Sequence, residues 1–405
     1  MDENMHKQKE NKFLKGALVG ALVVFIIMLP FLVFMTRKIV ADDTTTNIVT
    51  TEEEKKLREI NRLIQTRFLY EEDAKIEELR EGLYRGYVSE LGDPYSEYYD
   101  LEESTDVVED IQGRYSGIGA VLSQDIETKI ITMVHIYKDS PAEEAGLKDG
   151  DILYKVDGED ILGRTIEDVA SNLRGEEGTQ VEITVYRGDL PEEVSVTATR
   201  GQVEVETVIS EMKSDKIGYI RITEFREVTF GQYKEALEAL QQEGMEALIV
   251  DLRRNPGGGL GTVGDILGIM LPKNSAILTM KTADGSEETL RSEDKGSFEG
   301  ELVVLVNEFS ASASEIYAGA IQDHEMGTIV GTNTFGKGVI QQVFPLKDGS
   351  SVKLTIAEYF TANGNKIHGE GVEPDVEVKF ERDEEDENKD NQLEEAIKIL
   401  ENDIK

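Results

Sequence analysis

The stretch Leu302-Val-Val-Leu-Val-Asn-Glu-Phe-Ser-Ala-Ser-Ala-Ser-Glu-Ile316 decides the fold class of this chain. Its first five residues are apolar and mostly β-branched, which is typical of a buried strand. Residues 313–322 then have the pattern of a helix that begins directly after Ser312. A serine at that place lies where free backbone N–H groups converge, and the positive end of the helix favours negative charge there. The stretch therefore predicts a strand, a short loop and a helix, as in an α/β sheet.

A second segment, Gly331-Thr-Asn-Thr-Phe-Gly-Lys-Gly-Val-Ile-Gln341, places Lys337 between two glycines. Glycine lets the backbone bend sharply, so this loop can bring a long amine toward a site. Desolvation lowers the pKa of a lysine and makes its neutral amine a usable base. Together the two segments predict a serine nucleophile with a lysine base, and backbone N–H groups that hold the developing oxyanion.

Both segments also have explanations without catalysis. Ser312 and Glu315 match the Ser-x-x-Glu capping box of a helix, and Gly-Lys-Gly is a common turn. Composition favours catalysis by serine, because the chain has no cysteine and only four histidines. A pair of Ser312 with His324 is the runner-up assignment, but twelve residues along one helix span about 18 Å, too far for a hydrogen bond.

Another serine and lysine, Ser350 and Lys353, have the Ser-x-x-Lys spacing of penicillin-binding proteins and β-lactamases, in which a helix carries both residues. Here Asp348-Gly349 predicts a turn, and residues 352–356 alternate between apolar and polar as in a half-buried strand. Because residues three apart point to opposite faces of a strand, this pair is not expected to act together. We interpret the segment as a hairpin.

The two segments resemble the active-site signatures of the carboxyl-terminal processing peptidases, a family of tail-specific serine proteases with a Ser/Lys active site. The matching residues are Asn307-x-x-Ser-Ala-Ser-Ala-Ser-Glu-Ile316 and Thr334-Phe-Gly-Lys-Gly338. The resemblance implies that Ser312 is the nucleophile, that Lys337 is the base and that Gln341 orients its amine. It covers about residues 80–380 and departs locally at Asn333, where many members carry proline.

The stretch Asp251-Leu-Arg-Arg-Asn-Pro-Gly-Gly258 resembles the glycine loop of the same family. This implies that the amide of Gly258, with Gly257 as the neighbouring alternative, is one oxyanion donor and that the amide of Ala313 is the other. The resemblance implies no metal and no organic cofactor. From residue 210 onward strands alternate with helices, which indicates an α/β sandwich with its active residues in loops at the strand ends.

Residues 140–158 resemble a PDZ domain of the kind found in bacterial proteases. The resemblance implies that Gly117, Ile118 and Gly119 bind the terminal carboxylate of a peptide, since successive exposed N–H groups form an anion-binding nest. It also implies that an extended peptide adds as a strand beside a helix over residues 166–173, for which Thr165 is the predicted cap.

Arg174 follows this helix directly. In similar proteases an arginine at this place links a bound tail to the active site, so the resemblance implies that Arg174 gates the protease. The alternative is that Arg174 satisfies the last carbonyl groups of the helix and its dipole.

Residues 16–35 are 20 uncharged and mostly apolar residues, about the length that crosses a bilayer as a helix. Four lysines precede this run and two basic residues follow it, which favours a cytoplasmic N-terminus. The prediction is a single-pass protein of the cell membrane with its catalytic domain on the extracytoplasmic side. A cleaved signal peptide is the competing interpretation.

The remaining segments complete the predicted organisation. Residues 51–91 are expected to be helical, with a capping box from Thr51 to Glu54 and a turn at residues 92–98. The resemblance implies that these residues form an arm that joins two subunits, in a possible homodimer. The alternative is that they form a helical spacer. A charged linker and a docking helix follow residue 380. The predicted parts are 1–40 (tail and anchor), 41–110 (arm), 111–200 (PDZ), 201–380 (protease) and 381–405 (linker and helix).

The charge of the chain excludes one class of partner. Among 405 residues, 82 are acidic and 43 are basic, which gives a formal net charge of −39. Such a surface repels nucleic acid, so we expect no nucleic-acid partner.

From all of these segments we predict an α/β protein with a transmembrane helix, a helical arm, an α+β PDZ domain and an α/β sandwich. It is expected to act as an endopeptidase on proteins with free C-termini. The alternative is a catalytically inactive PDZ scaffold that only binds such tails.

Overall fold

The computed structural model describes residues 50–70, 75–188, 192–293, 296, 298–383, 386 and 389–404. The predicted transmembrane segment, residues 16–35, lies outside these residues. Within the described ranges, no helix is both long and apolar enough to cross a membrane. The chain divides into two units, Met1–Gly82 and Leu83–Lys405.

The first unit contains helix α2 (Thr51–Arg67) and the beginning of α3 (Ile76–Ser89). Helix α2 begins where the sequence predicted, but its capping residue is Thr50 rather than Thr51. The side chain of Thr50 accepts the N–H of Glu52 and contacts the carboxylate of Glu53. The predicted cap was therefore one residue late, because two threonines precede the glutamates and either of them fits the pattern.

The second unit begins with an arrangement that the sequence did not reveal. The last two residues of the predicted turn, 97 and 98, belong instead to a short strand, β1 (Glu97–Tyr99), and a helix, α4 (Leu101–Gln112), follows with a capping box between Asp100 and Glu103 at its start. Strand β1 pairs with β18 (Ser351–Thr361) of the protease body. Tyr98 and Tyr99 are buried in this pairing. Residues 97–99 are therefore a strand of the sheet of the body.

The PDZ domain is a curled antiparallel sheet of strand order β3-β4-β5-β7-β8, with the small strand β6 beside β5. Its strands are β3 (Ala120–Gln124), β4 (Ile131–Ile136), β5 (Ile152–Val156), β6 (Glu159–Asp160), β7 (Gln180–Arg187) and β8 (Glu192–Thr199). Helices α5 (Pro141–Glu144) and α6 (Ile166–Leu173) cover its core, and Thr165 caps α6 as predicted. Strand β2 (Arg114–Gly117) pairs with β9 (Gly201–Glu204), so residues 201–204 adjoin this domain. Strand β3 is at the edge of the sheet.

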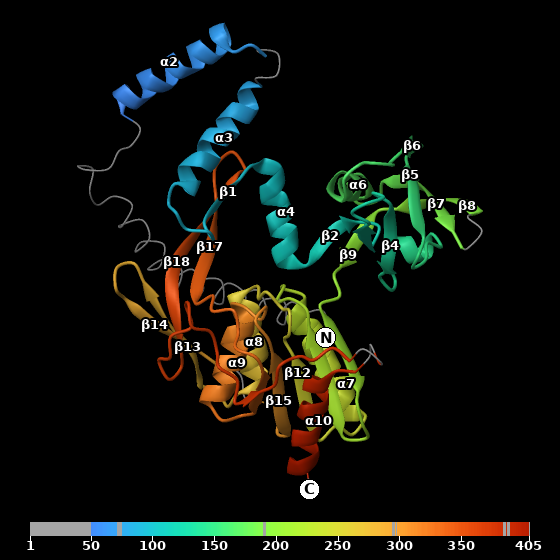
Figure 1. Cartoon of the computed structure of the whole chain (residues 1–405), viewed down its shortest axis with the longest axis vertical. Helices are drawn as coiled ribbons and strands as arrows, with labels where there is room; N and C mark the ends of the chain where they lie inside the picture. The colour runs from blue at the N-terminus through green and yellow to red at the C-terminus, as the bar shows by residue number, and fades with distance from the viewer. Residues whose placement is uncertain are drawn as a thin grey trace, which may run out of the picture. The chain divides into compact units, whose positions relative to one another are not determined.

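The protease body is built on a six-stranded sheet of order β10-β11-β12-β15-β16-β19, parallel except between β10 and β11. Its strands are β10 (Val208–Met212), β11 (Ile217–Ile222), β12 (Ala247–Asp251), β15 (Glu301–Val306), β16 (Thr328–Gly331) and β19 (Val376–Glu377). Helices α7 (Thr229–Gln242), α8 (Leu260–Met270) and α9 (Ala313–Asp323) pack on one face, and α10 (Asn391–Asp403) packs on the other (Figure 1). The central strands are buried on both faces, as parallel strands between helices require. The predicted α/β architecture is confirmed.

A second sheet flanks the first. Its strands are β1, β18, β13 (Ala276–Thr282) and β14 (Glu287–Arg291), and β17 (Val339–Pro345) pairs with β18 as the predicted hairpin. The Ser350 hydroxyl donates to Asp348 at 2.7 Å, whereas the Lys353 amine pairs with Glu97 at 3.3 Å. Ser350 and Lys353 thus have separate partners, as expected for a strand.

The predicted docking helix after residue 380 is α10, and it packs on the body of the same chain. Ala396 and Leu400 of α10 are buried against the sheet. An ion pair of 2.7 Å joins Arg253 to Asp390 at the start of α10, and another of 2.7 Å joins Arg253 to buried Asp251. Because Asp251 ends β12, this network fixes the start of the loop that follows that strand.

Candidate active site

Three loops converge at the carboxyl ends of neighbouring parallel strands. Residues 252–259 follow β12, residues 307–312 follow β15, and residues 332–338 follow β16. We call them the glycine loop, the nucleophile loop and the base loop. Since the strands are parallel and adjacent, segments that lie far apart in the sequence meet at one edge of the sheet.

Hydrogen bonds fasten the nucleophile loop to the glycine loop. The hydroxyl of Ser310 donates to the carbonyl oxygen of Leu252 at 2.8 Å, and the hydroxyl of Ser314 donates to that of Asn255 at 3.0 Å. Both serines are fully buried. Ser312, between them, instead lines a cavity of about 310 Å³. The middle serine of the three is therefore the one that a substrate can reach.

Ser312 has an uncommon backbone conformation, with φ of 55° and ψ of −113°. A non-glycine residue with positive φ stores strain that the surrounding structure must stabilise. The expected capping box with Glu315 is present, and the Ser312 N–H donates to the Glu315 carboxylate at 2.8 Å. The sharp turn aims the serine side chain into the cavity at the N-terminus of α9.

The hydrogen bonds of the glycine loop distinguish its three glycines. The N–H of Gly257 donates to the side chain of Asn255 at 2.8 Å, and that of Gly259 donates to Phe225 at 2.7 Å. Among the described residues, the amides of Gly258 and Ala313 have no hydrogen-bond partner. These are the two amides that the resemblance implied for the oxyanion, and Gly257, the alternative, is already engaged.

Both loop glycines are needed for steric reasons as well. Gly258 has φ of 142°, and a Cβ there would lie 2.2 Å from the carbonyl oxygen of Phe225. Gly257 has φ of 106°, and its Cβ would lie 2.7 Å from the Cβ of Ser312. The glycine loop therefore packs directly against the nucleophile.

The Lys337 amine is half-buried and lies 4.7 Å from the centre of the Tyr95 ring. Burial lowers the pKa of Lys337, and the positive charge of Lys353 lowers it further, while Asp93 and Glu315 act in the opposite direction. Tyr95 belongs to the segment that the sequence marked only as a turn. A lowered pKa suits a general base, because a larger fraction of the amine is neutral.

The backbones of Lys337 and Ser312 are held together, but their side chains are not yet joined. The Tyr359 hydroxyl lies 2.8 Å from the carbonyl oxygen of Lys337 and 3.1 Å from that of Ser312. In the part of the chain that the structure describes, no hydrogen bond connects the Lys337 amine to the Ser312 hydroxyl. The structure thus brings the two loops together while the amine rests on Tyr95.

The structure also places Gln341 and His324, the two remaining candidate residues of the site. Gln341 is in strand β17, and it lines the cavity with Ser312. Its amide nitrogen contacts the Thr355 hydroxyl at 3.5 Å rather than the Lys337 amine. His324 caps the far end of α9, and its ring contacts the carbonyl oxygen of Ala276 at 2.7 Å. This placement agrees with the exclusion of His324 on distance.

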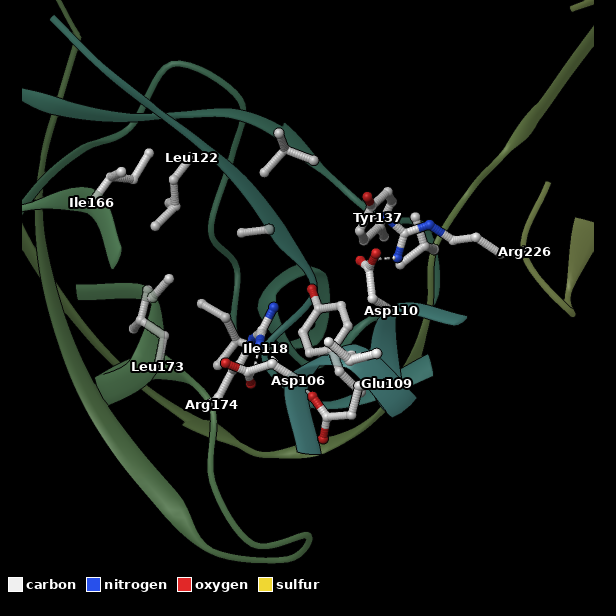
Figure 2. Close-up of a pocket in the computed structure, with 16 residues that line it drawn as sticks. Asp106, Glu109, Asp110, Ile118, Leu122, Tyr137, Ile166, Leu173, Arg174 and Arg226 are labelled. Atoms are coloured by element: carbon white, nitrogen blue, oxygen red, sulfur yellow. Dashed lines mark hydrogen bonds and ion pairs between the residues drawn. The ribbon is translucent and has the colours of Figure 1, made fainter. Parts of the chain in front are cut away.

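A second cavity, of about 570 Å³, lies between the PDZ domain, helix α4 and the residues Val205 and Arg226 (Figure 2). It runs between the edge strand β3 and helix α6, and its apolar wall is formed by Ile118, Ala120, Val121, Leu122, Ile166, Ala170 and Leu173. Ile118 is the central residue of the predicted carboxylate loop. Gly119 has φ of 82°, and a Cβ there would lie 2.5 Å from Ser140. An edge strand beside a helix is the setting in which a peptide can add as a strand.

Arg174 closes one end of this groove. Its guanidinium lies 3.3 Å from Asp106 and 3.7 Å from Glu109 of α4, and 5.1 Å from the centre of the Tyr115 ring, whose pKa burial raises to about 12. The last carbonyl groups of α6 are instead bound by Arg200, which donates to Asn172 at 2.8 Å and to Leu173 at 3.2 Å. The side chain of Arg200, and not that of Arg174, therefore binds the carbonyl groups at the end of α6.

Two residues, Asp110 and Arg226, line both cavities. Arg226 pairs with Asp110 of α4 at 2.8 Å and with Glu224 at 2.7 Å. Phe225, next to Arg226, exchanges hydrogen bonds with Gly257 and Gly259. The groove between β3 and α6, which we call the tail groove after its proposed role, and the glycine loop are thus connected through residues 224–226.

Among the residues that the structure describes, no group of histidine or acidic side chains is arranged to hold a metal ion.

Sequence profiles of three known families match the chain. The profile described as "Peptidase family S41" matches residues 216–378 and that described as "PDZ domain" matches residues 134–187. A third, described as "Activating protease CtpB N-terminal domain", matches residues 17–103.

Curated relatives and solved structures agree with these profiles. "Carboxy-terminal processing protease CtpA" of Bacillus subtilis is 36% identical over 305 residues, which are 75% of this chain and 65% of the relative. "Probable CtpA-like serine protease" of Staphylococcus haemolyticus is 37% identical over 302 residues, 74% of this chain and 60% of the relative. The chain thus spans less than two thirds of the length of either relative. A structure described as an S41 protease from Bacteroides fragilis has a TM-score of 0.52 at 18% identity, covers 89% of this chain and is itself covered to 99%, which supports the fold.

Proposed function

Because the chain belongs to peptidase family S41, we propose that it is a serine endopeptidase that processes the carboxyl-terminal ends of other proteins. One observation carries the proposal: Ser312 and Gly258 line one cavity, and among the described residues the amides of Gly258 and of Ala313, the residue after Ser312, have no hydrogen-bond partner. Such donors stabilise the charge that develops on a carbonyl oxygen under attack.

The reaction proceeds in two stages. The Ser312 Oγ attacks the scissile carbonyl carbon, neutral Lys337 takes the hydroxyl proton, and the amides of Gly258 and Ala313 bind the oxyanion. The Lys337 ammonium then protonates the leaving amine, and a water molecule hydrolyses the acyl-enzyme with Lys337 as base again. For the first step the amine must leave the Tyr95 ring and reach Ser312, and Gln341 orients it there.

The PDZ groove selects the substrate in this proposal. A tail adds to the edge of β3, and its terminal carboxylate binds the loop of Gly117, Ile118 and Gly119. Arg174 lies at that end of the groove and carries a positive charge. A bound carboxylate competes with Asp106 and Glu109 for Arg174, and this exchange gates the protease.

We also propose that residues 16–35 anchor the protein in the cell membrane with the protease on the extracytoplasmic side. The support is the length and the charge flanks of this run. Extraction of membranes with alkaline carbonate tests the anchor, because an integral segment keeps the protein in the pellet. A homodimer is a further proposal, and sedimentation of the detergent-solubilised chain tests it.

The rival function, a scaffold that only binds tails, is favoured by one observation: the Lys337 amine lies over the Tyr95 ring, and among the described residues it forms no hydrogen bond with the Ser312 hydroxyl. One experiment separates the two. The full chain in detergent is incubated with an unfolded protein, with the same protein lacking its last few residues, and with Ser312→Ala as control. A protease cuts the intact substrate, cuts the truncated one several-fold more slowly and depends on Ser312. Binding of the tail without any cleavage would support the scaffold instead.

A further inference from the structure

Glu315, on the first turn of α9, is a buried acid that the Ser/Lys chemistry does not itself use. Its side chain is completely buried. Within the described ranges, no lysine, arginine or histidine side chain forms an ion pair with it. A buried carboxylate without a counter-ion costs free energy unless several hydrogen bonds stabilise it.

Four donors supply that stabilisation, and they come from two loops. One carboxylate oxygen accepts the N–H of Ser312 and the N–H of Lys337, each at 2.8 Å. The other accepts the Thr334 hydroxyl at 2.6 Å and the N–H of Gly336 at 2.7 Å. A capping box needs only the first of these bonds. The remaining three all come from the base loop.

Glu315 is one of several groups that join the two loops, together with the Tyr359 hydroxyl and the bond of 3.0 Å from the Phe335 N–H to the Ser310 carbonyl oxygen. Ser312 is strained at φ of 55°, and the bond from its N–H to Glu315 holds that conformation. The base loop is irregular between β16 and β17, so no strand pairing sets its position. A single carboxylate oxygen therefore spans the backbone amides of the nucleophile and the base.

We propose that Glu315 is a positioning residue that sets the distance between Ser312 and Lys337 by binding the backbone amides of both. The inference rests on the proposed Ser/Lys function. Glu315 does not touch the substrate. It acts through the two residues that exchange the proton, since a general base must come within hydrogen-bond reach of the group that it deprotonates.

The test compares Glu315→Gln with the wild type in the full chain. An amide keeps the size of the side chain but turns one acceptor into a donor, which faces N–H groups or the Thr334 hydroxyl. We expect kcat to fall about 100-fold with KM within about twofold, because alignment for proton transfer is lost while the tail groove is untouched. The acidic limb of the pH profile should also move to lower pH, since the negative charge of Glu315 raises the pKa of Lys337.

The matched control is Glu103→Gln, which weakens the equivalent capping box at the start of α4. It should lower the melting temperature without changing kcat, KM or the pH profile. If Glu315→Gln does not fold, Thr334→Val and Thr334→Ser replace it. Thr334→Val removes the hydroxyl donor and should lower kcat about tenfold. Thr334→Ser keeps the hydroxyl and should have a kcat close to that of the wild type.

Two failures are distinguishable. A wild type that cleaves no better than Ser312→Ala would overturn the proposed function itself. A wild type that cleaves, together with Glu315→Gln of unchanged kcat, would overturn only the positioning role. The positioning role would also be overturned if Glu315→Gln and Glu103→Gln lower the melting temperature alike and both keep the wild-type pH profile and kcat.

Discussion

Gly258 has the least tolerance for a side chain among the residues around the nucleophile. Its amide is one of the two proposed oxyanion donors, and a Cβ would lie 2.2 Å from a backbone oxygen at φ of 142°. Gly258→Ala must therefore rotate or displace this amide. We expect kcat to fall about 100-fold or more, the usual effect of losing one oxyanion donor, in a steady-state assay on an unfolded protein.

The matched control for this substitution is Gly261→Ala, in the first turn of α8. A Cβ at Gly261 has open space around it, and alanine favours helix. Activity should be unchanged and the melting temperature equal or higher. If Gly258→Ala were as active as Gly261→Ala, the amide of Gly258 would not be an oxyanion donor.

The pH dependence of the protease should report Lys337. The proposed mechanism requires the neutral amine, so kcat/KM should rise as the pH increases through the lowered pKa of Lys337. Lys353 contributes to that lowering by its positive charge. Lys353→Gln should therefore raise the pKa of Lys337 and move the acidic limb to higher pH.

Exposed Lys347, in the turn of the same hairpin, is the control, because Lys347→Gln removes an equal charge outside the cavity. It should leave the limb in place. If Lys353→Gln leaves the acidic limb of the pH profile in place, or moves it to lower pH, that result would contradict the assignment of Lys337 as the base.

Single residues were predictable where one short segment contains their chemistry. Ser312, Lys337 and Gly258 each lie in a distinctive local pattern. The contacts of Tyr95, Tyr359 and Glu315 with the site were not predictable, since each joins segments that meet only in the folded sheet. Glu315 illustrates the difference, because its capping bond follows from spacing and its three bonds to the base loop do not.

At the scale of elements, α4 and α6 face each other across the tail groove. Arg174 follows α6 and pairs with Asp106 and Glu109 of α4. If Arg174 gates the protease, Arg174→Ala should lose most proteolysis and keep its fold and its affinity for a tail peptide, since a ligand shifts an equilibrium only through differential contacts. Proteolysis rate and peptide binding by fluorescence anisotropy are the two measurements.

Arg200→Ala provides the contrast, because Arg200 is the residue that binds the end of α6. Losing its bonds to Asn172 and Leu173 should lower the free energy of unfolding by about 2 kcal/mol and leave turnover near normal below the melting temperature. If Arg174→Ala loses only stability, as is expected of Arg200→Ala, then Arg174 has no part in the gating mechanism.

Most helices and strands of the body follow from periodicity, and α6 matches its predicted bounds with its cap. Strand β1 and helix α4 were missed. Strand β1 has three residues and owes its existence to pairing with β18, more than 250 residues away. Helix α4 has only four apolar residues among twelve, Leu101, Val107, Val108 and Ile111, so its helical pattern is weak in the sequence, and its one buried residue is Ser104.

At the scale of the whole second unit, the two cavities have different chemistry and share a border. The tail groove is apolar with charged residues at one end, and the catalytic cavity contains Ser312 and Gln341. Asp110 and Arg226 line both of them. The sequence predicted two modules and their residues, but their common border arises from side chains that meet only after folding.

The central claim, that Ser312 and Lys337 act as one catalytic unit, is tested most directly by cleavage rates of Ser312→Ala, Lys337→Ala, the double mutant and His324→Ala, each confirmed as folded by circular dichroism. Because a nucleophile and its base lose activity non-additively, each single mutant should be inactive and the double mutant no worse. His324→Ala should cleave at nearly the wild-type rate. An active Lys337→Ala together with an inactive His324→Ala would contradict the Ser/Lys mechanism.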